Sequence, residues 1–578
     1  MRILIEEYQY DVSKVRDVLY GIDALENMEG RVSIHYVGYY YNMLLKDCVF
    51  ILPKVLLKDV DGQELVFGKY KPEDIANLDT FDSKERSFLY KFAVWIYRAI
   101  VVYKNDRRND TRIVCQSHIA QICNRGRRQS NTYLDILLSL IQFNQDNQSF
   151  FFFIIKNLHS GLNKINWQRT IATQTAIIQN EQAVYLNPVN KRRQINFDEE
   201  LLIIFFSILN YIGDTYGFPK DICCQFQLIT GKRFDTYLNG FGKTRLRQIK
   251  YKYFSDKALQ LWHLCYNFFD EAQQVMVATE QRDYLLVKNF YVVFEAIIDE
   301  LIGDNPLPDG MEKQQEDGKI VDHLFTSQIL IAGANEQTYY IGDSKYYKIG
   351  HELGSQSIYK QYTYARNVIQ WNIDIFSNGD KSSSGVRLRD DVTEGYNILP
   401  NFFISAKLNE MFSYDDDNIE KTDRKRNRHK RVQFDNRLFD RDTLLLSHYD
   451  VNFLYVLSLY ARDNQSQKAA WKMKVRQHFC KEIQKWLDED YDFYFIKAKT
   501  GVDDKEYFKT HFQQLLGKFY APFEQYKDIY SLALEKGEKY QQENKLLLNQ
   551  LEDYFFVEKF KLEKDQQDVL VRIRTRTH

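Results

Sequence analysis

The chain has 578 residues, of which 44% are hydrophobic and 27% charged, as in a folded globular protein with room for three or four domains. The formal net charge is −1, which excludes a global basic field as the means of holding a polyanion and leaves only local basic patches. The seven cysteines lack paired CxxC spacing, so we expect reduced thiols and neither a structural zinc site nor a disulfide framework.

The N-terminal sequence, MRILIEEYQYD, lacks the basic-then-apolar order of a signal peptide. No apolar run approaches the roughly 18 residues that a membrane-spanning helix requires. We therefore expect a cytoplasmic protein without membrane contact.

Two different periodicities divide the first half of the chain. Residues 1–80 contain short runs of period-two alternation, such as GRVSIHYVGYYYN, which predict a β-rich N-terminal module. Residues 81–279 change to longer helical periods and predict a helical middle domain, with helices over 197–212 and 257–275.

The second half begins with the pattern of a compact α/β unit over residues 280–462. A helix over 288–302 precedes the strand-like runs KIVDHLF, SQILIAG and TYYIGDSKYYK, and a helix over 355–371 and a strand over 397–406 follow. Residues 463–578 are highly charged and predict a helical C-terminal tail. The expected fold class is thus α+β and multidomain.

Two acids and a lysine in the α/β unit are spaced for phosphodiester hydrolysis. Asp322 lies in GKIVDHLF, and Asp343 and Lys345 lie in TYYIGDSKYYK. Residues i and i+2 of a strand share a face, so Asp343 and Lys345 should lie together with Ser344 pointing away. The 21 positions from Asp322 to Asp343 allow a strand, a turn and an antiparallel return. Carboxylates of this kind bind Mg²⁺, and a nearby lysine positions water or neutralises phosphate charge.

Other polar residues flank this triplet. Glu295 lies on the preceding helix, which could aim it into the cluster, and the amide of Gln361 on the following helix could bind a phosphate. His323 should point to the strand face opposite Asp322 and is expected to be an ordinary core or sheet histidine. A literal Pro-Asp pair occurs at Asp309, but it lies in a glycine-containing loop, so we prefer Asp322.

Three basic clusters are candidate DNA contacts, because phosphate groups are bound by clustered lysine and arginine. For each of them an ordinary solvated surface is an equally good interpretation. The clusters are Lys243, Arg245, Arg247 and Lys250; Arg125, Arg127 and Arg128; and Arg424, Lys425 and Arg426.

The segment Gly242-Lys243-Thr244 invites comparison with a nucleotide-binding loop. That motif requires glycine five positions before Gly242, where this chain has Tyr237. We therefore predict no nucleotide site in the chain.

The ordered set Glu295, Asp322, Asp343-x-Lys345 and Gln361 resembles the PD-(D/E)xK nuclease core. The flanking segments VGYYYN, VFILPKVLL, RLRQIKYKYFSDKALQLWHLCYNFFD and LLLSHYDVNFLYVLSLYA resemble the LlaJI family of restriction endonucleases, relatives of the McrC nuclease subunit of GTP-dependent restriction systems. The resemblance is spread over residues 32–460. The chain departs from the pattern by carrying Asp343 where many members have Glu, and Val321 rather than Pro before Asp322.

This resemblance implies a restriction-endonuclease-like nuclease that cuts double-stranded DNA with Mg²⁺ or Mn²⁺. It implies that Asp322 and Asp343 bind the metal, with Glu295 completing the metal shell directly or through water. It also implies that Lys345 acts on the water, and that Gln361 supports the substrate or Lys345. It also implies a McrB-like AAA+ GTPase partner and leaves room for a DNA methyltransferase in the same system. Two alternatives stay open: a self-sufficient site-specific restriction enzyme, and a non-catalytic DNA-binding adaptor with a nuclease-like scaffold.

Overall fold

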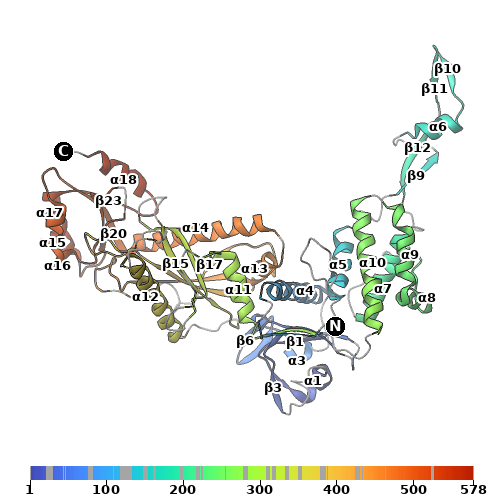
Figure 1. Ribbon diagram of the computed structural model, residues 1–578, viewed down its shortest axis with the longest axis horizontal. Coiled ribbons are helices and arrows are strands. Elements are labelled where there is room, and N and C mark those ends of the chain that lie inside the picture. The colour runs from blue at the N-terminus through green and yellow to red at the C-terminus, as the bar shows by residue number, and fades with distance from the viewer. Residues whose placement is uncertain are drawn as a thin grey trace.

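A computed structural model of the chain shows an extended molecule with a sheet-containing body at one end and a helical arm at the other (Figure 1). The structure describes residues 2–20, 30–42, 44–45, 47–75, 83–107, 110–116, 133–147, 154–159, 165–194, 200–216, 222, 226–253, 255–277, 284–307, 313–314, 320–331, 337–348, 354–377, 386, 388–409, 411–422, 430–432, 434–462, 464–522 and 526–576. Within these ranges no helix combines the length and apolarity needed to cross a bilayer.

The N-terminal module is built on a five-stranded sheet of order β1-β5-β4-β13-β8. Its strands are β1 (Arg2–Ile5), β5 (Asp47–Leu52), β4 (Tyr36–Asn42), β13 (Tyr284–Lys288) and β8 (Ile113–Gln116). The predicted β-rich character is confirmed, but two of the strands come from far outside residues 1–80. Local alternation could not reveal them, because their pairing depends on residues far apart in the sequence, such as Gly38 with Leu286 and Val114 with Leu286.

Smaller elements complete this module and lead into the helical region. They are β2 (Gln9–Asp11), α1 (Val12–Leu19), β3 (Arg31–Ser33), η1 (Lys54–Leu56), β6 (Leu57–Val60), β7 (Gln63–Val66) and α3 (Pro72–Ile75).

Gly38 is required where β4 meets β13: its φ is +143°, and a Cβ there would lie 2.1 Å from the Leu285 carbonyl oxygen.

The middle region is mainly helical, as predicted, and its apolar helix faces form one continuous core. Its helical elements are α4 (Ser83–Asp106), α5 (Tyr133–Asp146), α7 (Glu200–Tyr216), α8 (Lys232–Thr236), η4 (Tyr237–Phe241), α9 (Gly242–Ile249), η5 (Lys250–Lys252) and α10 (Asp256–Val277). Helices α7 and α10 closely match the predicted helices.

A narrow projection extends from the helical arm (Figure 1). It contains α6 (Trp167–Thr173) and the hairpin of β10 (Ile177–Gln179) and β11 (Gln182–Val184), above the strand pair β9 (Ile154–His159) and β12 (Val189–Gln194). Every residue of β10 and β11 is exposed. We call residues 166–188 the projecting hairpin.

The largest sheet follows the order β14-β15-β16-β19-β17, with β18 also paired to β19. Its strands are β14 (His323–Gln328), β15 (Gln337–Lys345), β16 (Pro400–Lys407), β19 (Leu444–Asn452), β17 (Ile419–Lys421) and β18 (Lys430–Val432). We call it the central sheet. Strands β15, β16 and β19 are parallel, and β14 returns antiparallel to β15, as the sequence predicted.

Helices cover both faces of the central sheet. Helix α12 (Ser355–Ser377) packs on one face through an apolar cluster that includes Tyr339, Ile341 and Val368. Helices α11 (Tyr291–Ile302), α13 (Phe453–Ala461) and α14 (Gln465–Asp490) contribute to the larger core on the other face, with Tyr340 and Phe402. The alternation of β15 thus places Asp343 and Lys345 on the α12 side.

The C-terminal region corrects the prediction of a helical tail. A four-stranded sheet of order β21-β22-β20-β23 runs through it, because segments such as YDFYFIKA alternate with period two. The elements are β20 (Tyr491–Ala498), α15 (Asp504–Thr510), α16 (Phe512–Leu515), β21 (Phe519–Tyr520), β22 (Ile529–Glu535), α17 (Gln541–Tyr554), β23 (Phe555–Phe560) and α18 (Gln566–Thr575).

Candidate active site

Asp322 and Asp343 meet on neighbouring strands. Asp322 comes one residue before β14, and the antiparallel register pairs His323 with Gly342, so Asp322 lies opposite Asp343. The two carboxyl groups share a hydrogen bond, and an Asp322 oxygen also accepts one from the Ser344 backbone N–H at 3.2 Å. The pair therefore sits at one point of the sheet, close enough to act on a single ion.

Lys345 completes a compact charged group. Its Nζ lies 2.5 Å from an oxygen of Asp343, as expected for residues i and i+2 of one strand. The lysine is 9% exposed and Asp343 is 1% exposed. Lys345 Nζ also lies 5.2 Å from the centre of the Phe403 ring on β16. Burial on this scale is unusual for charged side chains unless they are paired.

The pKa values of the two aspartates are shifted in opposite directions. Burial, with the hydrogen bond and negative charge of Asp343, raises the pKa of Asp322 to about 9. Burial would also raise the pKa of Asp343, but the hydrogen bond from Asp322 and the Lys345 ammonium outweigh it and lower that pKa below its usual value. Two carboxylates this close cannot both be charged without a cation between them.

Glu295 of α11 belongs to the same electrostatic environment. Burial, followed by the charge of Asp343, raises its pKa to about 7. Within the described ranges, no group of three histidine, cysteine or acidic side chains is placed to hold a metal ion. Of the two routes expected for Glu295, a direct bond to a metal ion or a contact through water, this geometry favours the contact through water.

Gln361 is fully buried beneath the site, on α12. Its amide nitrogen donates to the Ile341 carbonyl oxygen at 2.9 Å and to Asn401 Oδ1 at 3.1 Å. Both N–H groups are thus engaged with the protein, which leaves no amide hydrogen for the expected phosphate contact. Gln361 ties α12 to β15, the strand that carries Asp343 and Lys345.

Lys360 is a residue that the sequence analysis missed. It precedes Gln361 on α12, and its Nζ lies 5.2 Å from the centre of the Tyr364 ring. Burial lowers the pKa of Lys360, but the Tyr364 hydroxyl and the charges of Asp343 and Asp322 outweigh it and raise that pKa. A second cation therefore faces the aspartate pair. In the sequence, only the neighbouring Gln361 pointed to this part of α12. It did not reveal which face of the helix turns toward the central sheet.

His323 points to the opposite face of the sheet, as predicted. Its Nε2 lies 2.5 Å from Ser344 Oγ, and its Nδ1 lies 3.4 Å from Asp299 Oδ1. Burial lowers the pKa of His323 despite Asp299. The histidine is a fully buried, hydrogen-bonded part of the core.

The four predicted basic residues of α9 and η5 differ in their contacts. Lys243 forms an ion pair with Asp270, and Arg245 forms one with Glu200. Arg247 and Lys250 have no carboxylate partner in the described part of the chain and lie against aromatic rings. Arg247 donates two hydrogen bonds to Tyr266 Oη, at 3.0 and 2.7 Å, and Lys250 Nζ lies 4.4 Å from the centre of the Trp262 ring.

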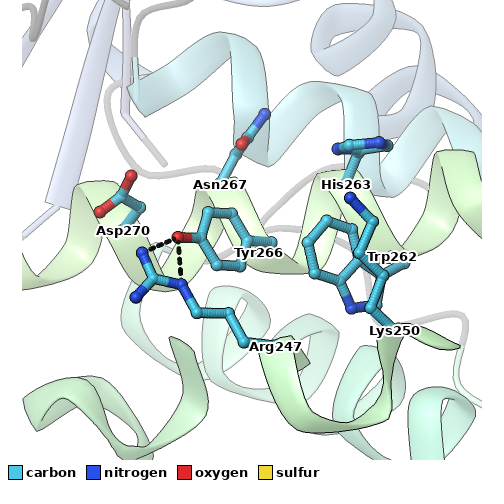
Figure 2. Close-up of a pocket in the computed structure, with 7 residues that line it drawn as sticks. All are labelled: Arg247, Lys250, Trp262, His263, Tyr266, Asn267 and Asp270. Carbon is cyan, nitrogen blue, oxygen red and sulfur yellow. Dashed lines mark hydrogen bonds between the residues drawn. The ribbon is translucent and has the colours of Figure 1, made fainter. Parts of the chain in front are cut away.

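Arg247 and Lys250 border a hollow of about 420 Å³ between α9 and α10 (Figure 2). We call it the α9–α10 pocket. It is also lined by Trp262, His263, Tyr266, Asn267 and Asp270. The Trp262 and Tyr266 rings stack, with centroids 5.0 Å apart. The lining therefore combines two stacked rings with two cations, Arg247 and Lys250, that have no carboxylate partner among the described residues.

The remaining predicted site residues lie outside the described ranges. They are Arg125, Arg127, Arg128, Arg424, Lys425 and Arg426, together with the alternative acid Asp309.

Comparison with known proteins gives weak likenesses. No family model matches the chain, and no curated protein matches it. One solved structure, a half-complex from a tetradecameric assembly of Thermococcus gammatolerans McrB AAA+ hexamers with bound McrC, is similar over 82% of this chain and 99% of that chain, with 12% identity and a TM-score of 0.30. Another, the McrBC complex of the same organism, is similar over 51% of this chain and 85% of that chain, with 12% identity and a TM-score of 0.15.

Proposed function

We propose that the chain is the DNA-cutting subunit of a restriction system, a cytoplasmic endonuclease of the PD-(D/E)xK type that requires Mg²⁺ or Mn²⁺. The observation that carries this proposal is the meeting of Asp322 and Asp343 on adjacent antiparallel strands, with Lys345 bonded to Asp343. A purely structural sheet gains nothing from three ionisable groups buried at one point, because burying charge is costly.

The aspartate pair fits a divalent cation. Its donors are hard carboxylate oxygens, which Mg²⁺ prefers, and Mg²⁺ commonly uses one or two of them together with waters. Burial and the negative charge of Asp343 raise the pKa of Asp322, and a cation beside the pair would offset that repulsion. Bound there, the ion would lower the pKa of its water and neutralise phosphate charge.

The remaining residues have separate tasks in hydrolysis. Lys345, whose Nζ lies 2.5 Å from an oxygen of Asp343, would donate a hydrogen bond to the attacking water and stabilise negative charge in the transition state. Lys360 would add positive charge from the α12 side. Glu295, with a pKa raised to about 7, can exchange a proton with water near neutral pH. Gln361 would hold β15 in register.

DNA would also be held far from the aspartate pair. Arg247 and Lys250 of the α9–α10 pocket lie in the helical arm, at the other end of the molecule from α12 (Figure 1). Phosphate contacts of this kind fix position on a duplex and carry no sequence information directly. They would hold a long duplex without specifying its sequence.

A partner would supply any nucleotide-driven step, and we propose a McrB-like AAA+ GTPase. The resemblance over residues 32–460 supports this partner. The projecting hairpin supports protein docking in general, because it exposes several large apolar side chains, and exposed apolar patches mark interaction sites. They are Trp167, Ile171, Ile177, Ile178, Val184 and Leu186.

The substitution Lys345→Ala tests the enzyme against the adaptor. We expect it to abolish DNA cleavage by the purified subunits and phage restriction in cells that carry the complete system, while thermal unfolding stays close to that of the wild type. Restriction that survives Lys345→Ala would support the adaptor instead. Robust cleavage by the isolated wild-type chain without nucleotide would favour the self-sufficient restriction enzyme.

A further inference from the structure

One carboxylate of the N-terminal module bonds to segments that adjoin the candidate active site. Glu6 directly follows β1, and its backbone N–H donates to the Leu52 carbonyl oxygen of β5 at 2.9 Å, so it is anchored to the N-terminal sheet. Its side chain leaves that sheet and is only 1% exposed.

The Glu6 carboxylate bonds to two segments that carry proposed active-site residues. Its Oε2 accepts a hydrogen bond from the Tyr346 hydroxyl at 2.6 Å, and Tyr346 directly follows Lys345 on the chain. Its Oε1 accepts one from the Phe290 backbone N–H at 3.3 Å. Phe290 is the N-cap residue of α11, the helix that carries Glu295.

Neighbouring contacts reinforce this junction. Lys54 donates its backbone N–H to Glu6 Oε2 at 3.3 Å, and its Nζ lies 5.1 Å from the centre of the Tyr346 ring. Two residues beyond Tyr346, Lys348 Nζ donates to Glu64 Oε1 at 2.6 Å and to the Glu7 carbonyl oxygen at 3.1 Å. The chain just after β15 is therefore held by the N-terminal module at several points.

We propose that Glu6 is a positioning residue of the nuclease: it fixes Lys345, through Tyr346, and Glu295, through the N-terminus of α11, relative to one another and to the N-terminal sheet. This inference rests on the proposed function. Glu6 touches neither substrate nor metal. It acts because a misplacement of about 1 Å in a catalytic group can cost roughly 100-fold in rate.

The junction also gives the N-terminal module a route to the chemistry. A displacement of β1 relative to the central sheet must either break the Glu6–Tyr346 bond or move Tyr346, and Lys345 with it. A partner that moves the N-terminal module would therefore also move Lys345, because the Glu6–Tyr346 hydrogen bond links the module to the residue that directly follows Lys345.

The test compares two conservative substitutions on β15 and its continuation. Tyr346→Phe removes the hydroxyl that binds Glu6 and keeps the ring. Tyr340→Phe is the matched control, because Tyr340 is equally buried on the same sheet face and its hydroxyl donates to the Gln328 carbonyl oxygen at 3.1 Å, away from the site. Both variants are assayed for single-turnover cleavage of plasmid DNA by the assembled enzyme, and for DNA affinity.

We expect Tyr346→Phe to lower the cleavage rate at saturating DNA at least ten-fold without changing DNA affinity, and Tyr340→Phe to stay within about two-fold of the wild type. Equal rates for the two variants, at equal folded fraction, would overturn the inference. If Lys345→Ala retains cleavage in the same assay, the proposed function fails instead.

A readout independent of activity is hydrogen exchange of the full chain. Glu6→Gln should speed exchange in peptides covering the start of α11 and the end of β15, and Tyr340→Phe should not. Unchanged exchange at both segments in Glu6→Gln would contradict the proposed coupling.

Discussion

The candidate active site and the projecting hairpin depart from the usual distribution of side chains in opposite directions. At the site, Asp343 and Lys345 are ionisable and almost fully buried. On the hairpin, Ile178 and Leu186 are apolar and 79% and 69% exposed. Both arrangements cost free energy in the isolated chain, since charge loses hydration and apolar surface meets water. The proposed function accounts for each arrangement by a ligand: a cation and DNA at the candidate active site, and a protein surface at the projecting hairpin.

The difference also predicts how the two regions respond to change. Residues of the site are fixed by several bonds, so a substitution there should alter chemistry sharply. Residues of the hairpin pack against little, so a substitution there should leave folding intact and alter only association.

The largest effect is expected from replacing either carboxyl group of the aspartate pair. Asp343→Asn and Asp322→Asn should each lower DNA cleavage at least 1000-fold, since they remove a proposed metal ligand and, in the first case, the partner of Lys345. Asp299→Asn is the matched control, because Asp299 is a neighbouring acid on the other face, near His323. The cleavage rate of Asp299→Asn should stay within about three-fold of the wild-type rate. Equal losses of cleavage in all three variants would contradict a special role for the aspartate pair.

A smaller effect is expected at the projecting hairpin, where substitutions should weaken partner binding without changing stability. Ile178→Asp combined with Leu186→Asp should weaken binding to a McrB-like GTPase at least ten-fold, measured by surface plasmon resonance. The free energy of unfolding should change by no more than about 0.5 kcal/mol, as is usual for substitutions at exposed positions. The control is Leu546→Asp, an equally exposed leucine of α17 at the far end of the chain. If the hairpin variant binds the GTPase as tightly as the wild type does, the projecting hairpin is not the docking surface.

The smallest effect is expected at the α9–α10 pocket. Arg247→Ala and Lys250→Ala should each weaken binding to a 30-base-pair duplex about three-fold at low salt. Each should also reduce the slope of log affinity against log salt by about 0.9, the value for one phosphate contact. Arg245→Ala should change the slope less, because Arg245 is paired with Glu200. A slope that is the same in all variants would count against a phosphate contact here.

Much of the central sheet could be predicted from local pattern. The i and i+2 rule placed Asp343 and Lys345 on one face, and the spacing from Asp322 to Asp343 fitted an antiparallel return, which the pairing of β14 with β15 confirms. These inferences hold because strand geometry depends on neighbouring residues. Helix α12 was found for the same reason.

The parts that escaped prediction depend on contacts between distant segments. Strands β8 and β13 join the N-terminal sheet from positions that looked like helical or core sequence. Lys360 reaches the site only because of the way α12 rotates on the sheet. Glu6 bonds to a residue 340 positions away, so no local pattern marks it. In the C-terminal region, charged residues on the strand faces hid the period-two alternation.

Metal binding by the isolated chain tests the central claim most directly. Titration with Mn²⁺, followed by calorimetry and electron paramagnetic resonance, should show binding at the aspartate pair that Asp322→Asn and Asp343→Asn abolish and Asp299→Asn preserves. Mn²⁺ binding that is the same in Asp343→Asn as in the wild type would contradict the account, because the two aspartates would then not be the ligands.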